Sequence, residues 1–174
     1  MTLATLCLVV AMNPLPGMTP APSTPRVRAM TTPARDLLAD ATRRSATVER
    51  LLRALEAQRV FVFVETRVDP TVPTAHTALL TANDSGRYVH VVLNPALTWN
   101  RRIELLGHEL QHALEIAVAA DVHDGASLRR HFTVIGRALG VVTRHEQSFE
   151  TDAARDVERE IRRDLRKRVA SAPR

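Results

Sequence analysis

The sequence predicts an α+β protein in which a small mixed sheet, including a β-hairpin, packs on one long helix and on further helices. A run rich in β-branched and aromatic residues, followed by two alternating segments around a turn, predicts the strands. Longer segments with apolar residues three or four positions apart predict the helices. Of the 174 residues 45% are hydrophobic but only 3% are aromatic, so the core must consist of Leu, Val, Ile and Ala.

The N-terminal region is predicted to lie outside the folded domain. Residues 1–12 are similar to an export signal, because Leu3–Val10 is a short apolar run and Val9–Ala11 suits a signal peptidase. No Lys or Arg precedes the run, so we expect an exported protein (secreted, periplasmic or associated with the cell envelope) and keep a cytoplasmic one as the alternative. Residues 13–33 are Pro-rich and predict a disordered linker. A single domain is then expected over residues 34–170.

The first elements of that domain are a helix and a strand. Thr32 and Pro33 form a helix-start signal, and apolar residues at helical spacing predict one helix to about Ala57. The segment Val60–Val68, VFVFVETRV, predicts a strand that is buried on both faces. Asp69-Pro70 and Pro73 are expected to end it.

A hairpin is predicted next. Its strands are His76–Thr81 and Tyr88–Leu93, and the turn chemistry of Asn83-Asp84-Ser85-Gly86 joins them. The hairpin comes directly before the longest helical segment, Asn100–Ala120. We therefore expect it to pack on that helix.

Two more helices are predicted after it. One covers Ala126–Leu139, and the other begins at a capping box of Thr143 and Glu146 and runs to about Val169. The last helix should bury an apolar stripe, with the lone carboxylate of Glu150 at its head. The members of that stripe are Ala154, Val157, Ile161 and Leu165.

Charge and cysteine content narrow the classes of function. The net charge is +5, but most Arg residues alternate with Asp and Glu, which is typical of a solvated helix with ion pairs one turn apart. No specific nucleic-acid partner is expected. Weak contact with a membrane surface, through the leader or the basic end of the last helix (Arg162–Arg168), remains the least favoured alternative.

Cys7 is the only cysteine, so any metal in the domain must be held by His and carboxylate groups.

The segment Ile103–Ala117, IELLGHELQHALEIA, contains the pattern H-E-x-x-H. On a helix His108 and His112 lie one turn apart on the same side and can both reach one ion about 2 Å away. Glu109 is rotated by about 100° from His108, beside the ion, where a base for a metal-activated water is needed. Gly107 lies on the flank of the helix's apolar face, where a missing side chain lets another element approach.

This pattern resembles the zincin metallopeptidases, a family of zinc-dependent proteases. The resemblance implies a minimal zincin-like domain that binds Zn²⁺ and hydrolyses peptide bonds of a peptide or protein substrate, with Glu109 as general base. It also implies that Tyr88–Leu93 aligns the substrate, with a plain sheet strand as the alternative. The long metzincin form is excluded, since Glu115 and Val118 stand where that branch has Gly and His. A gluzincin-like arrangement is left.

In that arrangement a Glu on a later helix completes the site, and Glu150 is the predicted third ligand. Ala154 stands where the gluzincin pattern has Asp, and an acid favoured by the helix dipole is the alternative reading of Glu150. The other candidate ligands are Glu146, Asp121 and His123. Glu115 is expected either to orient an imidazole or to form a surface ion pair.

A catalytic site also needs a group that stabilises the oxyanion. We predict His145 for this role, with alternatives in His131, His123, Arg144 and Tyr88. The competing hypothesis for the whole site is a zinc-binding protein without turnover, in which the metal stabilises the fold or a partner surface. A fourth protein ligand would favour that hypothesis, and an open coordination position would favour the enzyme.

Overall fold

The computed structural model describes residues 24–68, 74–141 and 147–170 and shows a mixed α+β architecture, as predicted. A four-stranded sheet has the order β1-β2-β4-β3, in which β3 is antiparallel to β4 and the other neighbours are parallel. A second sheet pairs β5 with β6. The strands are β1 Val27–Ala29, β2 Val60–Thr66, β3 Ala75–Asn83, β4 Gly86–Leu93, β5 Arg137–Val141 and β6 Gln147–Glu150.

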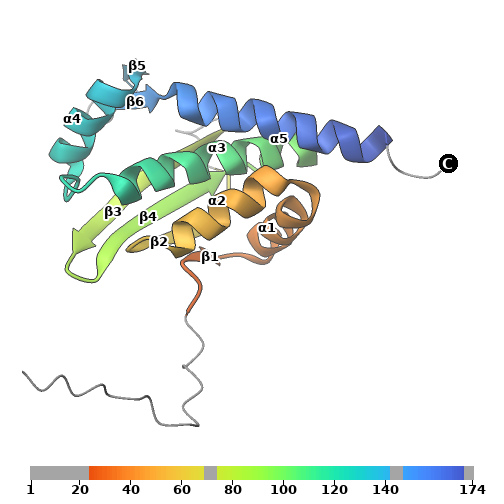
Figure 1. Ribbon diagram of the computed structural model, residues 1–174, viewed down its shortest axis with the longest axis horizontal. Helices are drawn as coiled ribbons and strands as arrows, with labels where there is room; N and C mark the ends of the chain where they lie inside the picture. Colours follow the sequence, from red (N-terminus) through yellow and green to blue (C-terminus); the bar gives the residue numbers. More distant parts are fainter. Residues whose placement is uncertain (1–23, 69–73, 142–146, 171–174) are drawn as a thin grey trace, which may run out of the picture.

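Three helices pack on the four-stranded sheet, and a fourth packs on them. Helix α3 contacts β3 and β4, α1 contacts β1 and β2, and α5 lies along α3 (Figure 1). Helix α4 and the β5–β6 pair lie together at one end of this layer (Figure 1). The helices are α1 Thr32–Arg44, α2 Ala46–Glu56, α3 Trp99–Val118, α4 Gly125–Ile135 and α5 Asp152–Ala170.

Strand β2 is buried on one face only, which corrects the prediction of a strand buried on both. Val60, Val62 and Val64 are fully buried, whereas Phe61 and Phe63 are half-buried. Because successive side chains of a strand point to opposite faces, the valines enter the core beneath the helices. The aromatic rings stand on the opposite face, where Phe61 stacks on Tyr88 at 5.1 Å between ring centroids.

The hairpin of β3 and β4 is confirmed, with longer strands than predicted. Its turn depends on Gly86, which has φ of 141°. A Cβ there would lie 2.4 Å from the carbonyl oxygen of Arg59, so no other residue fits this turn without strain. The stop residues predicted at 69–73 lie outside the described residues.

The first predicted helix is two helices, because Ser45 interrupts it. Ser45 has an extended backbone and its hydroxyl accepts from the Val48 N–H at 3.3 Å, so it caps α2. The start of α1 agrees with the prediction, with Thr31 as its cap and Pro33 in its first turn. Helical periodicity continued through residue 45 and concealed the break.

The domain includes residues before the predicted boundary at 34, because β1 lies inside the segment expected to be linker. Val27 and Ala29 pair in parallel with Val62 and Val64 of β2, and both side chains pack against the core. The predicted export signal, residues 1–12, and the linker up to residue 23 lie outside the described residues. No helix in the described ranges is long and apolar enough to cross a membrane.

The C-terminal third departs most from prediction. The helix expected over Ala126–Leu139 ends at Ile135, and the chain continues from Gly136 into β5. The last helix starts only at Asp152, where the Thr151 hydroxyl accepts from the Ala154 N–H at 3.1 Å and caps it. The capping box predicted at Thr143 and Glu146 lies outside the described residues. Glu150 therefore ends β6 instead of heading a helical stripe.

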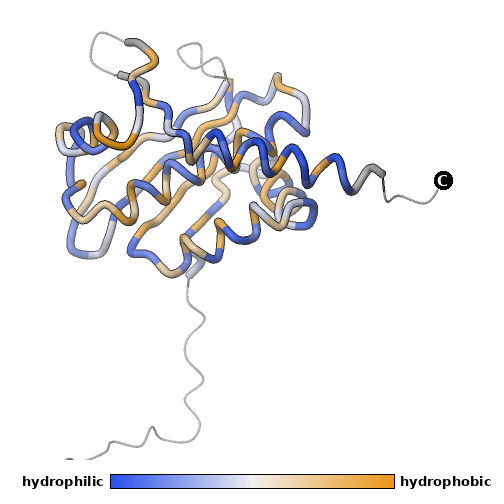
Figure 2. The backbone as a smooth tube through the Cα atoms, turned by 45° about the horizontal axis from the view of Figure 1, so that its top comes forward, coloured by the Kyte–Doolittle hydropathy of each residue, from blue (hydrophilic) through white to orange (hydrophobic). Residues whose placement is uncertain are grey.

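The stripe itself is confirmed and packs α5 on α3. Ala154, Val157, Ile161 and Leu165 are all buried, while the remainder of α5 is hydrophilic along its length (Figure 2). A Cβ on Gly107 would lie 1.9 Å from Cδ1 of Ile161, so Gly107 permits the close approach of the two helices, as predicted. One core cluster, aliphatic except for Phe132, joins these helices to the sheet.

Candidate metal centre

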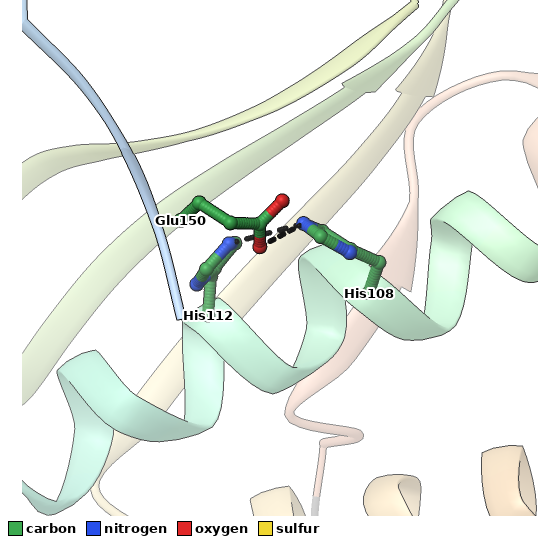
Figure 3. A group of neighbouring side chains, drawn as sticks. All are labelled: His108, His112 and Glu150. Carbon is green, nitrogen blue, oxygen red and sulfur yellow. Dashed lines mark hydrogen bonds and ion pairs between the residues drawn. The ribbon is translucent and has the colours of Figure 1, made fainter. Parts of the chain in front are cut away.

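Three predicted ligands converge in a buried group that could hold a metal ion. One ligand atom each from His108, His112 and Glu150 lies within 4.8 Å of the others. The histidines come from consecutive turns of α3 and the carboxylate from the end of β6 (Figure 3). Two imidazoles and a carboxylate are a donor set that suits a divalent transition metal.

The two imidazoles face each other through their Nε2 atoms, which are 3.2 Å apart. Oε1 of Glu150 lies 3.4 Å from Nε2 of His108. Both histidines are buried, with 9% and 6% of their surface exposed. Buried donors aimed at one point are the arrangement that a cation would satisfy.

Helix α3 is buried around most of its circumference, because the sheet covers one side and α5 and α2 pack on the others. The predicted far face is confirmed, since Ile103, Leu106 and Leu110 are fully buried. The histidine side is not exposed either. Glu104, Glu109 and Glu115 are buried as well, so the polar groups of this helix must find partners inside the protein.

Glu115 holds His112, which confirms one of its two predicted roles. Its Oε2 lies 2.8 Å from Nδ1 of His112, and its Oε1 accepts from the Thr151 hydroxyl at 2.8 Å and from the Gln111 amide at 3.3 Å. A carboxylate on Nδ1 fixes the proton there and leaves the Nε2 lone pair for a metal.

The electrostatics around these side chains favour positive charge. Burial alone lowers the pKa of His112, but its hydrogen bond to Glu115 and the charges of Glu109, Glu115 and Glu150 outweigh burial, so the pKa is raised. Burial likewise tends to raise the pKa of Glu115, yet its contacts with His112 and with the hydroxyl and amide donors lower it. Carboxylates that favour a buried imidazolium would also favour a metal cation.

Glu109 lies between α3 and the sheet, where it contacts β3. The Thr77 hydroxyl donates to Oε2 of Glu109 at 2.7 Å and lies 3.1 Å from the Glu109 carbonyl oxygen. Glu109 is not in the metal-ligand group but is close enough to act on the charge of His112. Its role as a general base beside the ligands stays a prediction.

Glu150 is held by the start of α5. Its Oε1 accepts from the Thr151 N–H at 3.1 Å, and its Oε2 lies 3.4 Å from Nε of Arg155. Gly136 packs closely against the backbone of Glu150, since a Cβ at Gly136 would lie 2.7 Å from the Glu150 carbonyl oxygen. The ligand is thus placed by the strand pair and by the helix cap, whereas the sequence prediction placed it on the helix.

The remaining predicted residues divide into three groups. Asp121 and His123 are exposed, and neither joins the two histidines in a metal-ligand group within the described ranges. His131 lies beyond Phe132, whose ring contacts both it and His112 edge-on at 5.6 Å. His145, Arg144 and Glu146 lie outside the described residues.

Two implications of the strand Tyr88–Leu93 are wrong. Strand β4 lies inside the sheet, paired with β2 and with β3, so it has no free edge to align a peptide. The edge strand beside α3 is β3. Tyr88 stacks on Phe61 and Phe63, on the sheet face opposite to the buried valines and α3, so it cannot reach the metal-ligand group.

Sequence reasoning missed Thr77. It belongs to a predicted strand, but no local pattern marks a hydroxyl that will face a helix residue 32 positions later. The available signal was the register of the hairpin, in which Thr77 pairs with Val91 of the buried face.

Comparison with protein families, with curated proteins and with solved structures finds no match to this chain.

Proposed function

We propose that the chain is a zinc-dependent metallopeptidase whose metal is held by His108, His112 and Glu150. The observation that carries the proposal is the convergence of these three donors with Glu109 beside them. Two His and one Glu are the protein ligands of one type of catalytic zinc site, which keeps a further position for water. The resemblance of the H-E-x-x-H helix to the zincins supports the same reading.

Zinc bound to these donors would supply Lewis-acid chemistry, polarising a carbonyl and making a water more acidic. Glu109 is the group placed to take a proton from the attacking water and to deliver it to the leaving amine. The Thr77 hydroxyl, which donates to Oε2 of Glu109, orients that carboxylate and leaves Oε1 for the water. The free edge of β3 is adjacent and suits an extended peptide.

The test is turnover of a peptide library by the wild type and by Glu109→Gln, with zinc content measured for both. The amide keeps the size of Glu109 but cannot act as a base, so turnover should fall by a factor of about 100 to 10,000 while zinc content stays the same. Equal turnover by the two proteins, above a blank without protein, would reject the catalytic role.

The strongest competing function is a zinc site that stabilises the fold without turnover. The near-complete burial of the two histidines and of Glu109, which is 5% exposed, favours it. In that case zinc removal should lower the melting temperature greatly while no peptide is cleaved. A spectrum of the Co²⁺-substituted protein discriminates, because an added anion changes it only where a coordination position is open.

A nucleic-acid or membrane-surface binder is less favoured, because basic residues of α5 are paired with acids. Arg159 pairs with Asp156, and Arg162 pairs with Glu158 and Glu104. Such pairs reduce the positive field that would attract phosphate.

A further inference from the structure

The two imidazoles of the metal-ligand group differ in what faces their Nδ1 atoms. Nδ1 of His112 makes a 2.8 Å hydrogen bond to Glu115. Nδ1 of His108 is buried and makes no hydrogen bond, yet Oε2 of Glu158 on α5 lies 3.4 Å from it. A buried polar atom without a partner is destabilising, so an unpaired nitrogen opposite a carboxylate calls for an explanation.

Glu158 is held in place by two arginines. Its Oε1 accepts from Arg162 at 2.7 Å and from Arg101. The same arginines also bind Oε2 of Glu104, at 2.9 Å and 3.0 Å. Both arginine contacts of Glu158 use its Oε1, so its Oε2 is left facing His108.

This network fixes the direction of the Glu158 carboxylate. Two guanidinium groups on one carboxylate oxygen restrict rotation of the side chain. Glu104, which shares both arginines, has its pKa lowered, since the contacts with Arg162 and Arg101 outweigh the effect of burial. The network connects α3 to α5 directly behind the first metal-binding histidine.

We propose that Glu158 is a positioning residue for His108, holding the proton on Nδ1 so that Nε2 is the metal-binding atom. This inference rests on the proposed zinc site and extends it to α5. A carboxylate on the far nitrogen of a metal-binding histidine fixes the ring and raises its basicity, and its loss costs about 10–100-fold in metal affinity. The two ligating imidazoles then each have a carboxylate on Nδ1, Glu115 for His112 and Glu158 for His108.

Glu104 supplies a matched control. It binds the same two arginines as Glu158 but makes no ion pair with a histidine in the part of the chain that the structure describes. Glu104→Ala and Glu158→Ala should therefore disturb the α3–α5 network to a similar degree. Only Glu158→Ala removes the group that faces His108.

The experiment measures zinc affinity by chelator competition for the full chain and for Glu158→Ala, Glu158→Gln and Glu104→Ala, each checked for folding by thermal melting. Glu158→Ala should bind zinc about 10–100-fold more weakly, Glu158→Gln should fall between it and the wild type, and Glu104→Ala should stay within about twofold. The ¹⁵N signals of His108 in the zinc-loaded protein should show a proton on Nδ1 in the wild type and a changed Nδ1 shift only in the Glu158 variants.

Each other outcome contradicts a specific statement. If the Glu158 and Glu104 variants lose affinity equally, the network is structural and Glu158 has no positioning role. If none loses affinity while the wild type binds zinc, the inference fails and the proposed function stands. If the wild type binds no zinc, the proposed metal site is wrong and the inference falls with it.

Discussion

The two parts of the molecule that supply the candidate metal ligands are built differently. His108 and His112 belong to α3, a helix packed between the sheet and α5 within the main core. Glu150 ends β6, a short strand paired only with β5, at the end of the layer where α4 lies. Packing of a large core fixes the histidines, whereas a backbone contact, a helix cap and an ion pair fix the carboxylate.

Because of this difference, effects of substitutions on unfolding can be separated from effects on metal binding. A change beneath the histidines should affect the unfolding of the whole protein, because their helix is part of the core. A change beneath Glu150 should affect metal binding first, because the β5–β6 pair, as far as the structure describes it, packs mainly on α4. The predictions below test this separation in order of expected effect.

The largest effect is expected from Gly136→Ala. The new Cβ would meet the Glu150 carbonyl oxygen at 2.7 Å, so β6 must shift and move the ligand. We expect zinc affinity to fall about 10–100-fold, with little change in the melting temperature of the zinc-free chain. Gly125→Ala is the control, since a Cβ there meets nothing within 4 Å. Unchanged zinc affinity in Gly136→Ala would show that Glu150 does not depend on this contact.

Thr151→Ala should come second, because Thr151 joins the two parts. Its hydroxyl donates to Glu115 behind His112 and accepts from the first turn of α5. Loss of a helix cap costs about 1 kcal/mol, and loss of the hydrogen bond to the buried Glu115 carboxylate adds to this. Chemical denaturation should show a loss of about 1–2 kcal/mol, which Thr151→Ser should largely restore. A serine variant as unstable as the alanine variant would contradict the role of the hydroxyl.

Gly107→Ala should follow, with the opposite signature to Gly136→Ala. The methyl group would displace Cδ1 of the fully buried Ile161, and overpacking a core costs about 1–3 kcal/mol. The gain in helix propensity, about 1 kcal/mol, offsets part of it. We expect a net loss of about 1 kcal/mol in unfolding free energy and nearly unchanged zinc affinity at temperatures where the variant is folded. A loss of zinc affinity without a loss of unfolding free energy would contradict the statement that packing of the core fixes the histidines.

The smallest effect concerns acid stability of the packed helices. Burial tends to raise the pKa of Asp164, but hydrogen bonds from Ser45 and Thr47 outweigh it and lower the pKa. A lowered folded-state pKa stabilises the protein above the carboxyl's ordinary pKa, and this stabilisation is lost as pH falls through the folded-state value. Asp164→Asn should cost less than about 1 kcal/mol at neutral pH. Denaturation curves at several acidic pH values should show that its deficit shrinks as pH falls; a constant deficit would contradict this.

The packed part of the fold was the part that sequence patterns predicted. Helical periodicity predicted α3 and the buried stripe of α5, and turn chemistry predicted the hairpin whose turn ends at Gly86. Periodicity could not show the break at Ser45. The Ser45 hydroxyl caps α2 through the Val48 N–H, which depends on local backbone geometry. It also donates to the carboxylate of Asp164, 119 positions away. Nor could periodicity show β1, whose three residues form a strand only because β2 pairs with them.

The candidate site divides in the same way. The spacing of His108 and His112 on one helix is a local property, so the pattern alone placed them together. Glu150 was chosen correctly for the metal-ligand group but for a partly wrong reason, since it ends a strand and does not head a helical stripe. The groups around the ligands, Thr77 and Glu158, come from elements whose relative placement no local pattern encodes.

The most direct test of the account is the zinc content of the purified full-length chain and of His108→Ala, His112→Ala and Glu150→Ala, determined after loading with zinc and removal of the excess. The account predicts about one zinc per folded wild-type chain and a large loss in all three variants, the Glu150 variant included. A wild type without zinc, or a Glu150→Ala variant that keeps the full complement, would contradict the claim that these three residues bind one ion together.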